Sequence, residues 1–202
     1  EEGKYYATNR LPNKAGSSLM LQRILLCNDK GRRIVGHPYI EKDGFGIYVY
    51  LGFERTTKLV VGNEVLIESL TLTYHPDSET GSLQLVGFVR SNIEVVSEGN
   101  EVLPTFKELK DLSILDLGSF VEIKGLTVTS RFTSNNTGDH TISCEDSLGN
   151  SIDLHIQSGV SETTINSKFV IGSKIDVIAP LSRYMSSYQL EMSTLDGVSF
   201  ID

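Results

Sequence analysis

The chain lacks any run of eighteen or more apolar residues, so no segment is predicted to cross a membrane as a helix. Its first ten residues, EEGKYYATNR, lack the basic-then-apolar layout of a secretory signal. They therefore predict either a cytosolic protein or a chain that begins after a processed segment. Positive charge is also scarce, because 18 Lys and Arg face 26 Asp and Glu, for a net charge of −8. This balance provides no general attraction for a polyanion.

Motifs for catalysis and metal binding are missing as well. None of the four histidines (His37, His75, His140 and His155) has a Cys, His or carboxylate at ligand spacing on the same predicted element. A nucleophile motif, a phosphate-binding glycine loop and a CxxC pair are also missing. The sequence predicts a chain without catalytic residues, metal site or cofactor.

Cysteine is limited to Cys27 and Cys144, one in each half of the chain. Neither half can therefore contain a disulfide of its own. Two buried free thiols are predicted, with a bridge between the halves as the alternative. The redox compartment stays open.

What the chain does contain is a repeated stretch. LVVGNEVLI at residues 59–67 reappears as FVIGSKIDV at residues 169–177, each with a glycine before alternating apolar positions. Flanking features recur in the same order, and the glutamines of SLQL and SYQL, Gln84 and Gln189, give a period of roughly 105 residues. The sequence predicts two similar all-β domains in tandem, residues 1–103 and 104–202. Their charges are about −2 and −6.

Each half is divided by turn residues into five strands and a closing edge strand. The predicted strands are 19–26, 34–41, 46–51, 59–67 extending to about 74, 83–89 and 93–96, then 120–130, 140–145, 151–156, 169–180, 188–192 and 198–201. Thr105 with Glu108 predicts a capping box that opens a short helix in the linker. Residues 158–169 have room for one or two helical turns between the third and fourth strands of the second domain.

Five strands with a variable insertion between the third and fourth are typical of a small Greek-key barrel of the OB type. Both halves resemble the OB-fold modules that occur in tandem beside the nuclease domains of secreted bacterial nucleases and in related surface proteins. The resembling segments are GIYVY, LVVGNEVLIESLTLTY, SLQL, GNEVLPTFKEL, GSFVEIKGLTVTS, IDLHI, FVIGSKIDVIAPL and SYQL. The resemblance implies an accessory, non-catalytic part of an exported protein, extracellular or at the cell surface. A separate catalytic domain, such as the nuclease domain that these residues lack, would be one partner.

An OB barrel binds nucleic acid with its second and third strands and with the loops after its first and fourth strands. In the first domain, Tyr48 and Tyr50 fall two apart on one predicted strand and hence on one face. Lys30, Arg32 and Arg33 lie in the loop after the first strand, where they could contact phosphates of a single strand. The alternative is that the tyrosines cover the barrel and the cations are solvated.

The second domain supports nucleic-acid binding less well. Its matching strand offers Asp153 and His155 on one face, and a carboxylate there would repel phosphate. Arg183 and Tyr184, in or beside the loop after the fourth strand, are its candidate contacts. The second hypothesis for the whole chain is a non-catalytic module that binds protein or glycan, or acts as a spacer. Tyr and Arg serve protein interfaces equally well.

Overall fold

The structure, a computed structural model, describes residues 19–21, 24–25, 38–42, 45–50, 61–67, 71–75, 81–87, 91 and 93–201. It divides into two compact units. The first comprises Glu1–Leu103 together with Ser113–Phe120, and the second comprises Pro104–Leu112 together with Val121–Asp202. The Ser113–Phe120 segment thus belongs with the first unit, whereas the sequence assigns it to the second domain.

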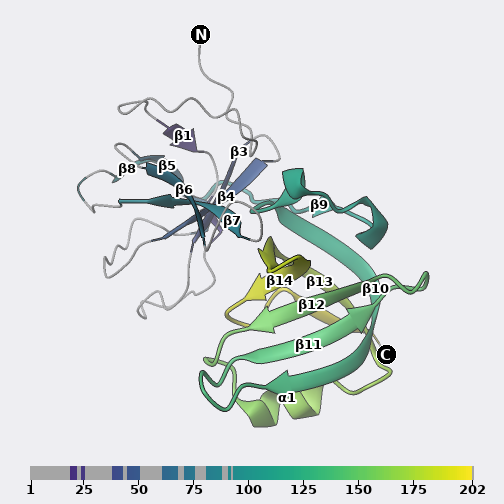
Figure 1. The fold of residues 1–202 in the computed structure, drawn as a ribbon. Helices are drawn as coiled ribbons and strands as arrows, with labels where there is room; N and C mark the ends of the chain where they lie inside the picture. The colour runs from purple at the N-terminus through teal and green to yellow at the C-terminus, as the bar shows by residue number, and fades with distance from the viewer. Residues whose placement is uncertain are drawn as a thin grey trace. The chain divides into compact units, whose positions relative to one another are not determined.

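The described chain is mostly β-structure, as predicted (Figure 1). Strands of the first unit are β1 (Leu19–Leu21), β2 (Ile24–Leu25), β3 (Tyr39–Lys42), β4 (Phe45–Val49), β5 (Glu64–Ile67), β6 (Thr71–His75), β7 (Ser82–Val86) and β8 (Ile93–Ser97). The later elements are β9 (Thr105–Phe106), η2 (Leu109–Asp111), η3 (Ile114–Asp116), β10 (Phe120–Thr133), β11 (His140–Glu145), β12 (Ser151–Ile156), α1 (Glu162–Lys168), β13 (Lys174–Tyr184), β14 (Ser187–Met192) and β15 (Val198–Ile201).

The first unit has two sheets among its described strands, with orders β1-β5-β8 and β2-β3-β4-β7-β6. Alternating positions of these strands point inward, which is how a strand buries one face. The inward residues form one apolar core of Ile40, Val49, Val65, Ile67, Leu85 and Ile93. Burial of these side chains holds the two sheets together.

The second unit has one sheet of order β15-β13-β14-β12-β11-β10-β9, and β13 also pairs with β10. That additional pairing closes the strands from β10 to β14 into a ring, and closure removes sheet edges. Inward positions alternate along β12, where Ile152, Leu154 and Ile156 are buried between half-exposed neighbours.

The two units share their pairing pattern. β4 runs parallel to β7 with Tyr48 opposite Gln84, and β12 runs parallel to β14 with Asp153 opposite Gln189. In both units a glycine in the left-handed region precedes a strand of the core, Gly62 with φ +87° and Gly172 with φ +88°. The glutamines and glycines singled out in the sequence therefore occupy matching places in the two pairing schemes.

Helix α1 is fixed at both ends. Ser161 accepts a hydrogen bond from the backbone N–H of Thr164 at 3.2 Å and so caps the N-terminal end. At the other end Arg131 of β10 donates to the carbonyls of Asn166 (3.3 Å) and Phe169 (2.6 Å). A cation suits the carbonyls that a helix leaves unpaired at its C-terminus. The sequence predicts this helical insertion but not the arginine that holds it.

Arg131→Met should lower the free energy of unfolding by about 1–2 kcal/mol, because it deletes a charged donor from two helix-end carbonyls. Lys107→Met provides a control, since that lysine lies in another part of the second unit. Urea titration followed by backbone amide signals of the second unit would measure the difference. Equal stability of the two variants would contradict the assigned role of Arg131.

Three predicted elements differ from the structure. The capping box at Thr105 is wrong, because Thr105 and Phe106 pair in parallel with β10 and Lys107 N–H donates to Glu122 O at 3.0 Å. These sheet pairings leave no helix start at Thr105. The capping box forms instead at Ser113, whose N–H donates to Asp116 Oδ2 at 2.8 Å.

The repeated stretch also begins with a turn and becomes strand only in its second half. Val61 and Gly62 form a turn before β5, and Val170–Ser173 form one before β13. Residues 59–60 and 68–70 lie outside the described residues. The strand at 64–67 was predicted to extend to about residue 74, and residues 71–75 form a separate strand, β6. Conversely, the predicted loop 181–187 is mostly strand, because β13 continues to Tyr184.

Candidate nucleic-acid interface

The face of β3 and β4 that points away from the core carries three tyrosines. Val49 is fully buried and Ile47 packs on the core, so Tyr48 between them lies on the opposite face. Tyr48 stands opposite Tyr39 of β3, with ring centroids 5.4 Å apart at a tilt of 49°. Tyr50 follows directly after β4 with 45% of its surface exposed, and its N–H donates to Leu85 O. The predicted aromatic pair is thus extended by a third ring.

Tyr39 was not predicted from the sequence as part of this face, although a signal for it was present. Asp43-Gly44 between two predicted strands is typical of a tight hairpin turn, and a hairpin register determines which side chains face each other across it. In the structure this register sets Tyr39 opposite Tyr48. Tyr39 is only 9% exposed, so its ring supports Tyr48 more than it faces solvent.

The same face is partly occupied by the Ser113–Phe120 segment of the first unit. Glu41 of β3 accepts a hydrogen bond from Phe120 N–H at 2.8 Å, and Gly46 N–H donates to Ser119 Oγ at 3.2 Å. Glu41 is 5% exposed and Ser119 is 3% exposed. The end of the hairpin near Gly46 is therefore covered, and Tyr50 at the other end remains the most exposed aromatic side chain of the face.

The corresponding face of the second unit is polar and acidic. Asp153 and His155 lie on the outer face of β12, as the sequence predicts. They stand opposite Ser143 and Thr141 of β11 on one side. On the other side they stand opposite Gln189 and Glu191 of β14.

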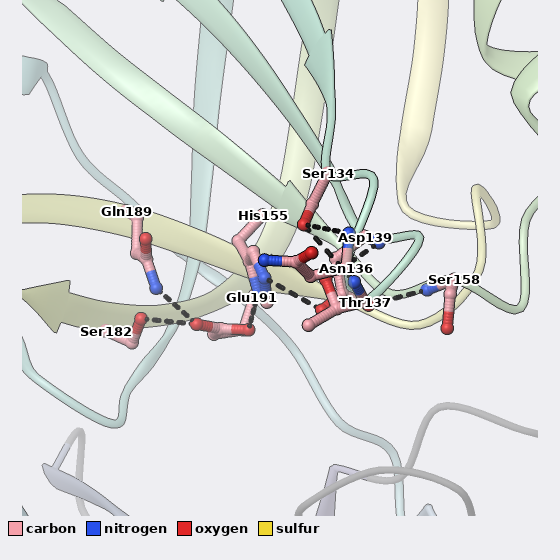
Figure 2. Close-up of polar contacts among 9 residues, drawn as sticks. All are labelled: Ser134, Asn136, Thr137, Asp139, His155, Ser158, Ser182, Gln189 and Glu191. Atoms are coloured by element: carbon pink, nitrogen blue, oxygen red, sulfur yellow. Dashed lines mark hydrogen bonds and ion pairs between the residues drawn. The ribbon is translucent and has the colours of Figure 1, made fainter.

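His155 is the centre of a hydrogen-bonded network on this face (Figure 2). Its Nδ1 lies 2.9 Å from Glu191 Oε2, and its Nε2 lies 3.9 Å from Asp139 Oδ2. Glu191 Oε1 in turn accepts from Ser182 Oγ at 2.9 Å and from Gln189 Nε2. Asp139 also accepts from Ser158 N–H at 2.9 Å, which ties the loop after β10 to the chain after β12.

The two carboxylates determine the protonation of this network. The hydrogen bond that His155 donates to Glu191 raises the pKa of His155 above its usual value, against burial, which lowers it. Burial acts to raise the pKa of Asp139, but hydrogen bonds from Thr137 and Ser158 outweigh it and leave that pKa lowered. Both ring nitrogens of His155 face carboxylates, so the ring links the loop after β10 to the sheet.

The network predicts a pH-dependent stability. Because the pKa of His155 is raised on folding, the stability from its charged form is fully present below its unfolded pKa, about 6.5, and is lost as the pH rises through the folded pKa. Urea unfolding between about pH 6 and 8 should therefore show a decline in the wild type that His155→Gln removes. His75→Gln, in the first unit, is the control. Parallel curves for wild type and His155→Gln would rule out this contribution.

The remaining predicted residues are only partly placed. Tyr184 of β13 stands opposite Ser187, on the face of the sheet that points away from the core, and it is 65% exposed. Arg183 lies opposite Tyr188 in the alternate register, so the strand does not present it beside Tyr184. Lys30, Arg32, Arg33 and Cys27 lie outside the described residues, so their predicted roles stay predictions. Cys144 is a buried free thiol, and burial raises its pKa to about 12.

Within the described ranges no group of three or more His, Cys, Asp or Glu is arranged to hold a metal ion. Over the same residues no helix combines the length and apolar character needed to cross a membrane.

Comparison with known proteins shows a short similarity to proteins of the large ribosomal subunit. No family model matches the chain. Over 41 residues it is 46% identical to the large ribosomal subunit protein bL21c of Trieres chinensis, and 44% identical to that of Phaeodactylum tricornutum. The protein of Thalassiosira pseudonana is 42% identical over the same length. The match covers 20% of this chain and spans only 39% of the length of each of these relatives.

Proposed function

We propose that the chain is a non-catalytic nucleic-acid-binding module built of two OB-like barrels, in which the first unit binds single strands. The observation that carries the proposal is the tyrosine face of β3 and β4, with Tyr48 held against Tyr39 and Tyr50 exposed. These are the second and third main strands of the unit, the strands with which OB barrels bind oligonucleotides. Stacking on such rings tolerates any base sequence.

The strand pairing supports the OB-like part of the proposal. In the second unit the first three main strands are β10, β11 and β12, followed in the sheet by β14 and then β13, which returns to β10. A five-stranded Greek-key barrel of the OB type has this kind of closure. The similarity to proteins of the large ribosomal subunit supports nucleic acid as the ligand, over the 41 matched residues. The exported, cell-surface location follows from the resemblance alone and is proposed with it.

Binding is expected in the low-affinity range of about 10⁻⁴–10⁻⁶ M, because the chain is acidic and the Ser113–Phe120 segment covers part of the face. Tyr50→Ala should weaken binding of a labelled single strand by about 1–3 kcal/mol at any salt concentration, since it removes a stacking ring. Tyr50→Phe keeps the ring and should bind as the wild type does. Titrating the oligonucleotide with protein at low salt measures both.

For Arg33→Ala, the slope of log affinity against log salt concentration should be shallower by about one, because the variant loses one phosphate contact. Comparing the affinities of the wild type and the variant over a salt series tests this. The proposal fails if the wild-type protein does not bind the oligonucleotide at high micromolar concentration.

A second candidate function is protein or glycan interaction. The observation that favours it is the outer face of the second unit, where Asp139, Asp153 and Glu191 place carboxylates that would repel a phosphate chain. A ligand of this face would bind without the steep salt dependence of nucleic acid. The salt series therefore distinguishes the two functions.

A further inference from the structure

A glutamine of the first unit lies in the same cross-strand row as one of the tyrosines. Tyr48 of β4 stands opposite Gln84 of β7, and Gln84 stands opposite Thr73 of β6. Residues that stand opposite each other on paired strands point to the same face of the sheet. Leu85, the next residue on β7, belongs to the apolar core. Gln84 therefore points away from the core, on the face that carries Tyr48.

The side-chain amide of Gln84 is buried without a partner. Only 8% of the residue is exposed, and its amide makes no hydrogen bond to any residue that the structure describes. The hydroxyl of Thr73 beside it donates instead to the carbonyl of Tyr74 at 3.3 Å. An amide carries two N–H donors and an acceptor oxygen, and leaving them unpaired away from water costs free energy. Because buried polar groups are normally paired, this exception indicates a partner supplied from outside the fold.

The second unit has a glutamine at the matching place, and there the amide is paired. Gln189 lies on β14 beside the parallel strand β12, as Gln84 lies on β7 beside the parallel strand β4. Its Nε2 donates to Oε1 of Glu191, two residues further along the same face (Figure 2). The residue two positions after Gln84 is Val86, which offers no acceptor. The same side chain is thus used within the second unit and left available in the first.

The position of Gln84 beside a stacking ring defines the chemistry of that outside partner. A base stacked on Tyr48 lies parallel to the ring and turns one of its edges toward the neighbouring side chains. Single-stranded bases are recognised by hydrogen bonds to their Watson–Crick and Hoogsteen edges. A glutamine amide forms two such bonds with adenine, whose N6 amino group has an acceptor nitrogen on either side, N1 and N7. Adenine therefore meets a complementary donor and acceptor from both edges.

We propose that Gln84 recognises adenine in a single strand bound on the tyrosine face, with the base stacked on Tyr48. The inference rests on the proposed nucleic-acid function and adds a base preference to it. The amide oxygen accepts from the N6 amino group, and an amide N–H donates to the ring nitrogen beside that group. Because the amide is shielded from water, a base without the amino group leaves the amide oxygen unpaired and binds less tightly.

The test uses the full chain and two labelled single strands of equal length. One is an oligo-deoxyadenosine, and the other carries unsubstituted purine, which lacks the N6 amino group, in place of every adenine. The two strands have the same ring system and the same number of phosphates, so stacking and charge are matched. The adenine strand should bind at least about 10-fold more tightly, the discrimination expected of a paired amide. Backbone amide signals of β4 and β7 should shift when it binds.

Gln84→Met keeps the length of the side chain and removes its hydrogen-bonding groups. The variant should bind the two strands with equal affinity. The urea midpoint of its first unit should rise, because an unpaired amide is replaced by an apolar group. Gln189→Met is the matched control. It should leave the discrimination between strands unchanged and lower the urea midpoint of the second unit, since it deletes the hydrogen bond to Glu191.

Three outcomes would overturn the base preference alone. These are equal binding of the two strands by the wild type, discrimination that persists in Gln84→Met, and a lower urea midpoint for the first unit of Gln84→Met. The last result would show that the amide already has a partner in the free protein. In each of these cases binding of a single strand by the wild type would leave the proposed function standing. If the wild type binds neither strand, the proposed function and the base preference both fail.

Discussion

Phe169→Ala should lower the free energy of unfolding of the second unit by about 3–5 kcal/mol, the cost of emptying a fully buried phenylalanine site. Phe169 is among the largest fully buried side chains, and it also makes the edge-on contact with Phe200. Its backbone carbonyl accepts from Arg131 at the end of α1. The substitution therefore removes volume where the helix, β13 and β15 meet the core.

Phe132→Ala is the matched control, because the same side chain is deleted from a position that is 63% exposed. Its effect should stay within about 0.5 kcal/mol. Urea titration followed at amides of β12 and β14 would report the second unit alone. If Phe169→Ala costs no more than Phe132→Ala, the assignment of Phe169 to the core is wrong.

Phe169 also illustrates what the sequence could predict. It opens FVIGSKIDV, and the alternating apolar positions after Gly172 predict the buried Ile175 and Val177 because a strand has a period of two. The same reasoning placed β11, β12, β14 and β15 within a residue or two. Local patterns of this kind are strong wherever one face of a strand is buried.

The elements that were misplaced depend on contacts between distant segments. Thr105 has the sequence of a helix cap, but its backbone joins β10, sixteen residues on, in a parallel pair that no local pattern signals. Likewise Leu181–Tyr184 contain polar and turn-forming residues, yet β14 pairs with them across a tight hairpin. Tertiary pairing overrides local preference in both cases.

The candidate site shows the same division. The alternation of a strand was enough to predict that Asp153 and His155 share a face. Glu191 lies two residues after Gln189 on the paired strand, so the same alternation could have predicted it as a neighbour of His155. The contacts of Glu41 with Phe120 and of Gly46 with Ser119 link segments more than seventy residues apart. Such contacts depend on how the chain folds back, and the residues involved have no shared motif.

The second large effect is expected where Gly46 and Gly118 bring two backbones together. A Cβ on either glycine would overlap backbone atoms of the other, and Gly118 also has φ +85°. Gly118→Ala should therefore carry a left-handed backbone cost of about 1–2 kcal/mol and a steric cost of about 1–3 kcal/mol. Gly46 has no positive φ, so Gly46→Ala should show the steric cost alone.

Gly149→Ala separates the two contributions, since Gly149 has nearly the same φ, +84°, but open space around its Cβ position. It should show only the backbone cost. The double variant Gly46→Ala/Gly118→Ala should cost less than the sum of the single variants, because either substitution already separates the Ser113–Phe120 segment from β4. Loss of amide hydrogen-exchange protection at Gly46 and Phe120 should accompany both single variants, as these N–H groups lose Ser119 Oγ and Glu41 as acceptors. Additive costs with unchanged protection would show that the segment does not rest on the tyrosine-bearing face.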